Sequence, residues 1–82
     1  ITDFEKLPTV VLYPNPVSSY FTLNTTTSKV QIFSITGQLV KSFDSTKTAG
    51  SEFSVSDLNP GLYIVKTFDE NENIKVLKLL KK

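Results

Sequence analysis

The sequence predicts an all-β fold, a seven-stranded antiparallel immunoglobulin-like β-sandwich, and three observations support this prediction. Seven short runs of the chain are rich in β-branched and aromatic residues. Turn residues separate these runs at intervals of about 8–12 residues, as in small sandwiches. No stretch long enough to form a stable helix shows the helical period of about 3.6 residues.

The composition limits both the size and the chemistry of the domain. The 82 residues leave room for one domain, and 39% of them are hydrophobic and 11% aromatic. Nine lysines against eight carboxylates give a net charge of +1, which excludes a disordered tail and a strongly basic protein that binds nucleic acid. Because Cys and His are absent, the usual zinc sites, disulfides, thiol nucleophiles and imidazole bases are excluded. We therefore expect neither catalysis nor a cofactor.

The N-terminal residues give expectations about the parent protein. Residues 1–6 contain neither the basic nor the apolar stretch of a signal peptide, so we expect the chain to be cut from a longer precursor. The longest apolar run, residues 10–13, is far shorter than the roughly 20 residues of a membrane-spanning helix. No membrane span is therefore expected.

The first two predicted strands are residues 10–13 and 20–23. Between them lies the stiff segment Pro14-Asn15-Pro16, in which both prolines have a fixed φ angle and no amide donor. The second strand is followed by the Thr-rich residues 24–28, where side-chain hydrogen bonds compete with strand pairing. We expect both intervening segments to be turns.

Residues 29–35 and 38–43 are the next two predicted strands, joined by the two-residue turn Thr36-Gly37. Gly37 supplies the positive φ that such hairpin turns require. Residues 44–51 are polar and predict a loop. Because the connection is short and contains this glycine, residues 29–43 form the clearest hairpin of the sequence.

A fifth strand is predicted at residues 52–56, where apolar and polar side chains alternate. The turn at residues 57–61 follows, in which we expect Asp57 to act as a cap and Leu58 to close one end of the sandwich. Residues 62–68 and 73–80 then form a second hairpin. The alternative for the second of these runs, an amphipathic helix over residues 75–82, is too short to be stable alone.

Alternating side chains indicate which positions form the core. Val30 and Ile32 alternate with their neighbours, and Ile35 then breaks the register, which indicates a β-bulge. Residues 62–68 are apolar at both odd and even positions, so we expect a central strand covered on both faces. Residues 74–80 show apolar side chains on both sides as well.

Metal binding and glycoside hydrolysis are two functions that the acidic residues could suggest, but the sequence fits both poorly. Residues 69–73 begin like a calcium-binding loop, yet Ile74 replaces the required Gly and Leu80 replaces the required Glu. A solvated hairpin loop is the better interpretation, and no metal site is expected. The eight carboxylates give no reason to select a pair for glycoside hydrolysis.

The lysines are concentrated at the C-terminus. Four of the nine, Lys75, Lys78, Lys81 and Lys82, lie in the last eight residues. Charged side chains on an edge strand prevent association between sheets, and they can also attract an acidic partner. Charge alone favours the first interpretation and leaves the second open.

Three segments together resemble a known family. They are LYPNP at residues 12–16, VQIFSITGQLV at residues 30–40 and LNPGLYIVK at residues 58–66. In this order and spacing, before a lysine-rich end, they resemble the type A C-terminal sorting domain of the type IX (Por) secretion system. The family usually has an acidic or polar residue and an Arg or Lys around the middle glycine, and this chain has Ser34 and Gln38 at those places.

The resemblance implies a role as an address label without catalysis. The precursor would reach the periplasm, the outer-membrane machinery would recognise the folded domain, and a sortase-like cysteine peptidase would usually remove it from an upstream cargo domain. The cargo would then be at the outer-membrane surface or secreted. Residues 1–8 would be the linker to the cargo, and residues 9–82 the sorting domain.

The resemblance also implies roles for individual residues. The residues expected to contact the translocon are Lys75, Lys78, Leu79, Lys81 and Lys82. The residues expected to maintain the structural motifs are Tyr13, Pro14, Asn15, Pro16, Gly37, Pro60, Gly61 and Tyr63. The alternatives are a purely structural spacer and an accessory module of a cell-surface enzyme, which would bind carbohydrate through Tyr13, Tyr20 or Tyr63.

Overall fold

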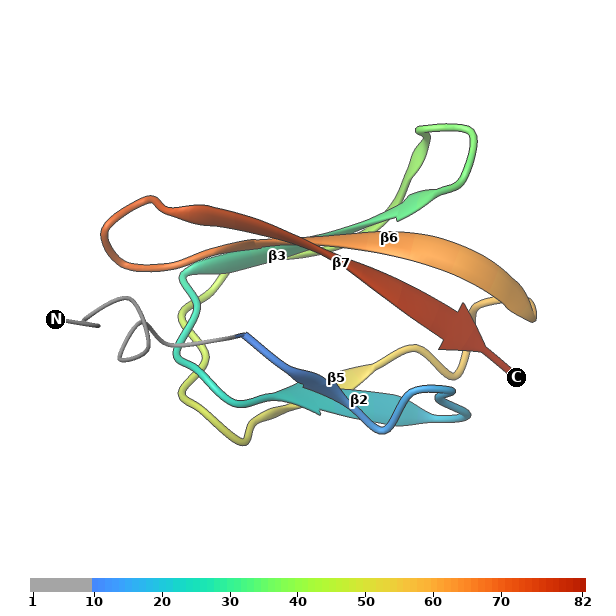
Figure 1. The fold of residues 1–82 in the computed structure, drawn as a ribbon, viewed down its shortest axis with the longest axis horizontal. Coiled ribbons are helices and arrows are strands. Elements are labelled where there is room, and N and C mark those ends of the chain that lie inside the picture. The colour runs from blue at the N-terminus through green and yellow to red at the C-terminus, as the bar shows by residue number, and fades with distance from the viewer. Residues whose placement is uncertain (1–9) are drawn as a thin grey trace, which may run out of the picture.

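Residues 10–82 are described by the computed structural model, and they form two stacked antiparallel sheets, as predicted (Figure 1). One sheet has the strand order β1-β2-β5 and the other β4-β3-β6-β7. The strands are β1 (Leu12–Tyr13), β2 (Tyr20–Leu23), β3 (Lys29–Ser34), β4 (Leu39–Phe43), β5 (Glu52–Ser54), β6 (Gly61–Phe68) and β7 (Ile74–Lys81). The described part of the chain contains no helix that could span a membrane. The predicted linker, residues 1–8, lies outside the described residues, so the domain boundary remains a prediction.

The core lies between the inner faces of the two sheets. Phe21 of β2 stacks on Phe53 of β5 with 5.1 Å between ring centroids, and Phe43 of β4 meets Phe53 edge-on at the same distance. Burial of each large side chain stabilises the fold by about 1.5–3 kcal/mol. The buried apolar residues are Leu12, Val17, Phe21, Leu23, Val30, Ile32, Phe53, Val55, Val65 and Leu79. The prediction that Val30 and Ile32 share the inner face is confirmed.

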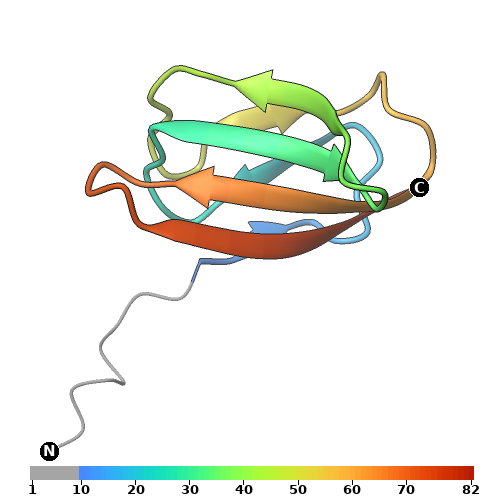
Figure 2. The same ribbon diagram turned by 90° about the horizontal axis from the view of Figure 1, so that it is seen from above.

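The prediction that residues 62–68 are covered on both faces is wrong. β6 is central within its sheet, since it pairs with β3 on one side and β7 on the other (Figure 2). Val65 and Thr67 face the core, but Leu62, on the opposite face, is 44% exposed. Two layers leave each sheet with one outer face, and no third layer covers this one within residues 10–82.

The β3–β4 hairpin is longer at its tip than predicted. Residues 35–38 connect the strands, and the Gly37 amide donates to the Ser34 carbonyl at 2.9 Å. Gly37 has a φ of +92°, as expected for a glycine in this turn. The irregular pairing lies between Ile32 and Phe33, opposite an additional residue, Val40, in β4. The bulge is therefore in the partner strand rather than at Ile35.

The turn before β6 closes one end of the sandwich. Leu58 is partly buried against the core, as predicted. The Tyr63 hydroxyl donates to the Asn59 carbonyl at 2.6 Å, an arrangement like the tyrosine corner of immunoglobulin-like sandwiches. Gly61 begins β6 with a φ of +151°. Asp57 was expected to cap this turn. Its carboxylate forms an ion pair with Lys41 at 3.0 Å, and this contact joins the turn to β4.

Candidate functional site

The lysine-rich strand β7 lies at an edge of the four-stranded sheet (Figure 2). The side chains of Lys75, Lys78 and Lys82 are exposed. Lys81 is only 8% exposed, and its Nζ donates to the Lys82 carbonyl at 3.1 Å. Leu79 is fully buried in the core. Of the five residues predicted to contact a translocon, three therefore present side chains at the surface of the fold.

The C-terminal half of this edge is held by the Pro-Asn-Pro motif. The Asn15 Nδ2 donates to the Lys78 carbonyl at 3.0 Å, and the Asn15 Oδ1 accepts from the Leu80 amide at 3.0 Å. One side-chain amide thus forms both hydrogen bonds that a neighbouring strand would form here. We call this contact, together with the backbone of Val17, the clasp.

Val17 extends the clasp to the end of the chain. Its amide donates to the Leu80 carbonyl, and its carbonyl accepts from the Lys82 amide, both at 2.8 Å. The side chain of Val17 is fully buried, so the segment is anchored in the core while it pairs with β7. The last residues of β7 are therefore bonded on both sides, by β6 and by the clasp.

The sequence predicted a structural role for Asn15 within its motif but not its contacts with β7. The motif indicated a turn, and residues 14–19 do connect β1 to β2; Tyr13-Pro14 and Asn15-Pro16 are both cis peptide bonds. The partners of Asn15 lie 63 and 65 residues further along the chain. The only indication in the sequence was that Asn15, a polar residue, lies between two prolines, which have no amide donors.

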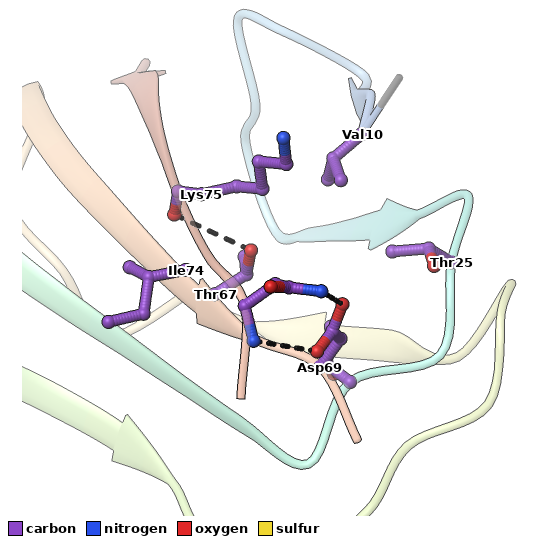
Figure 3. A pocket seen from close by; sticks show the side chains of 8 residues that line it. Val10, Thr25, Thr67, Asp69, Ile74 and Lys75 are labelled. Atoms are coloured by element: carbon purple, nitrogen blue, oxygen red, sulfur yellow. Dashed lines mark hydrogen bonds between the residues drawn. The ribbon is translucent and has the colours of Figure 1, made fainter. Parts of the chain in front are cut away.

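A cleft of about 360 Å³ opens at the other end of the sandwich, beside the β6–β7 hairpin (Figure 3). Thr67 points toward it, with its Oγ1 3.5 Å from the Lys75 carbonyl. Thr27 is 1% exposed, and its Oγ1 has no hydrogen-bond partner. The lining residues are Val10, Thr25, Thr27, Thr67, Asp69, Asn73, Ile74 and Lys75.

The carboxylate of Asp69 organises the hairpin loop beside this cleft. It accepts hydrogen bonds from the backbone amides of Asn71 and Asn73, both at 2.8 Å, and from the Asn73 Nδ2 at 3.2 Å. The bond from the Asn73 amide is the main reason that the Asp69 pKa is lowered from its ordinary value. Asp69 thus has a structural role in the loop, and residues 10–82 contain no group of three acidic side chains that could hold a metal ion.

A second carboxylate is tied to the sheet. Lys41 Nζ lies 3.1 and 3.0 Å from the two carboxylate oxygens of Asp57, and this hydrogen bond is the main reason that the Asp57 pKa is lowered. The contact joins β4 to the turn before β6. Both pKa values are lowered, whereas a general acid needs a raised one, so neither shifted carboxylate is suited to that role.

The three tyrosines of the carbohydrate alternative differ in their surroundings. Tyr63 is partly buried, and its hydroxyl is bonded to the Asn59 carbonyl. Tyr13 and Tyr20 are 47% and 48% exposed. Their neighbours Leu12 and Phe21 are buried, so both tyrosines point outward from the three-stranded sheet.

Comparison with known proteins gives a family for this architecture. The family model described as a secretion system C-terminal sorting domain matches residues 11–82. No curated protein matches the sequence. The match covers nearly all of the described residues and confirms the resemblance seen in the three sequence motifs.

Proposed function

We propose, from the premise that this chain belongs to the family of secretion system C-terminal sorting domains, that the secretion machinery recognises it through the exposed lysines of β7. As a member of this family, the chain is a C-terminal sorting signal of type IX secretion, which directs export to the cell surface or into the medium. The further steps in the proposal are passage of the cargo through the periplasm, contact with the outer-membrane translocon, and removal of the domain by a sortase-like peptidase.

The observation that supports this recognition is the fixed position of the basic strand. Lys78 and Lys82 are exposed on the C-terminal half of β7, which is bonded on one side to β6 and on the other to the clasp, while Lys75 is exposed at the hairpin end of the strand, opposite Thr67. A strand held in this way presents its charges in one geometry, which reduces the ordering cost of binding. Three exposed ammonium groups favour a partner that carries carboxylates at the matching positions.

The test uses a periplasmic reporter fused to the N-terminus of these 82 residues in a bacterium with a type IX secretion system. Export of the reporter by the native chain is expected. Replacement of Lys75, Lys78 and Lys82 by Gln should lower the exported fraction without changing the thermal unfolding of the purified domain. Lys47→Gln, in the β4–β5 loop, is the control. Full export of the triple variant would contradict the role of these lysines.

Deletion of residues 77–82 is a weaker test of recognition than these substitutions. The deletion removes Leu79 from the core and most of the pairing between β6 and β7. A loss of export would then follow from unfolding as well as from loss of contact. The exposed lysines can be changed without either effect.

Removal of the domain is tested by the position of the cut. We place the cut within or before residues 1–8, the segment that precedes the described sandwich. Sequencing of the N-terminus of the released domain in cells with an active sortase-like peptidase should locate it there. A cut inside residues 12–81, within the sheets, would contradict the proposal, as would an unchanged cut in cells that lack the peptidase.

The outward tyrosines support one alternative function. Tyr13 and Tyr20 lie on the same face of the three-stranded sheet, and aromatic side chains exposed in this way can stack on sugar rings. A carbohydrate-binding module would retain polysaccharide on a column, and Tyr13→Ala with Tyr20→Ala would abolish the retention. A sorting signal without this function would show no retention.

A further inference from the structure

The outer face of the four-stranded sheet is unusually apolar for a surface turned to solvent. Antiparallel sheets with one free face normally carry polar side chains there. On β6 and β7 the outward positions instead include Leu62, Ile64, Phe68, Ile74, Val76 and Leu80. Val76 is 62% exposed, and Leu62 and Leu80 are 44% and 45% exposed and directly opposite one another. Contiguous exposed apolar side chains mark interaction sites.

The charges on this face are of one sign. Lys29 and Lys66 both lie over the ring of Phe68, with Nζ at 5.3 and 5.6 Å from its centroid. Lys78 faces outward between Val76 and Leu80. The outward positions of β3, β6 and β7 hold no carboxylate. Glu72 borders the face at the hairpin end, where it lines a shallow hollow with Lys29 and Phe68.

We propose that this outer face docks on a protein surface of the secretion machinery that has an apolar centre and carboxylates among its contacts. The proposal rests on the proposed function, and it adds the apolar outer face to the lysines as the element that is recognised. Four strands about 4.8 Å apart and up to eight residues long give a face on the order of 500 Å². That area is typical of a transient interface, as a sorting signal requires.

The lysines favour this occupant over the two others that an apolar face can have. A second copy of the chain would place this face, whose charged groups include Lys66 and Lys78, against another face with only positive charges, which is unfavourable. A membrane surface favours Trp and Tyr at its contact positions, and the outward positions of β6 and β7 contain neither. The lysines of this face lie among its apolar side chains and not only at its border. A protein surface can place carboxylates at the matching positions within an apolar contact.

The sign of a charge introduced at Val76 separates docking from folding. Val76 lies directly opposite Lys66 in the register of β6 and β7. For folding, Val76→Glu is favourable relative to Val76→Lys, because Glu would pair with Lys66 and a second Lys would repel it. For docking on an acidic surface, the order is reversed. The two variants lose the same apolar contact and differ only in sign.

The experiment measures export of the reporter fused to the full chain. Val76→Glu should lower the exported fraction about tenfold relative to Val76→Lys. Lys66→Glu should lower it relative to Lys66→Gln by a similar factor. The same pair of changes at Val11, a 45% exposed valine outside this sheet, is the matched control and should leave export equal for both signs. Thermal unfolding of each purified variant verifies that the sandwich forms.

The outcomes distinguish this proposal from the proposed function. If the native chain fails to export the reporter, both are overturned. If the native chain exports it and Val76→Glu is exported as well as Val76→Lys, the docking face alone is overturned. Binding of the purified chain to vesicles of anionic phospholipid that is lost in Lys66→Glu, or dimerisation that is lost in Val76→Glu, would assign the face to a membrane or a second copy and would also overturn it.

Discussion

The side chain of Asn15 pairs with the backbone of Leu80 across 65 residues of sequence. Its Oδ1 accepts from the Leu80 amide while its Nδ2 donates to the Lys78 carbonyl, each at 3.0 Å. An edge strand exposes unpaired backbone groups to other chains. The clasp removes that exposure where β7 ends, and it links a motif near the start of the domain to the strand proposed as the signal.

Asn15→Ala should therefore loosen the C-terminal end of β7. Loss of two hydrogen bonds at an exposed site is expected to lower the free energy of unfolding by about 1–2 kcal/mol. Urea denaturation measures this change, and hydrogen exchange should show faster exchange of the Leu80 amide. Asn71→Ala, at an exposed position of the β6–β7 loop, is the control. Equal effects of the two substitutions would contradict the role of the clasp.

Asn15→Asp is a finer variant of the same experiment. The carboxylate can still accept from the Leu80 amide, but it cannot donate to the Lys78 carbonyl and would be repelled by it. The Leu80 amide should therefore stay partly protected while stability remains below that of the native chain. Native stability in this variant would show that the Lys78 contact contributes nothing.

Thr27→Val should stabilise the domain. Thr27 is 1% exposed, and its backbone amide and carbonyl pair with Lys47, but its Oγ1 has no partner. A buried hydroxyl without a hydrogen bond costs about 1–3 kcal/mol, and valine replaces it with a methyl group of similar size. We expect a gain of about 1 kcal/mol by urea denaturation.

Thr67→Val is the matched control for this prediction. Thr67 is also buried, at 2% exposure, but its Oγ1 lies 3.5 Å from the Lys75 carbonyl. Its replacement should bring no gain in stability. Destabilisation by Thr27→Val would mean that the Thr27 hydroxyl does form a hydrogen bond in solution.

The sequence predicted those parts of the fold in which one face of a strand is clearly apolar. Val30 and Ile32 alternate with less apolar neighbours, and both are buried as expected. Strand β6 carries apolar side chains on both faces, and this pattern indicated burial on both. The alternation of side chains along a strand shows how apolar each face of the sheet is, but it does not show whether another layer covers that face.

The candidate site was predictable only in part. The density of lysines in residues 75–82 identified the strand, yet the sequence did not show that Lys81 is nearly buried and Leu79 fully so. The direction of each side chain depends on the register of β7 against β6. The clasp could not be predicted, because it joins a side chain to backbone groups more than 60 residues away.

Tyr63→Phe should weaken the turn before β6. The hydroxyl donates to the Asn59 carbonyl at 2.6 Å, and the substitution removes this bond while keeping the ring. The expected loss of unfolding free energy is about 1 kcal/mol. Tyr20→Phe, at a 48% exposed position, is the control and should change stability by less than about 0.5 kcal/mol. If Tyr63→Phe leaves the midpoint of urea denaturation unchanged, the hydroxyl of the tyrosine corner does not contribute to stability.

Asp69 should make the stability of the domain depend on pH in the acid range. Hydrogen bonds from the amides of Asn73 and Asn71 favour the charged carboxylate, so its pKa is lower in the folded chain than the ordinary value of about 3.9. The unfolded chain therefore binds a proton first as the pH falls. The stabilisation is complete above about pH 4 and is lost as the pH falls through the lower pKa of the folded state.

Asp69→Asn removes this titration, so its free energy of unfolding should decline less steeply below about pH 4 than that of the native chain. Urea denaturation at a series of pH values between 7 and 2 measures both curves. Glu70→Gln changes the net charge by the same amount within the same loop and separates the local effect from the general one. Asp57, held by Lys41, retains its own pH dependence in every variant, so some decline should persist. Parallel curves for Asp69→Asn and the native chain would mean that the Asp69 carboxylate titrates alike in the folded and unfolded states, which its three hydrogen bonds argue against.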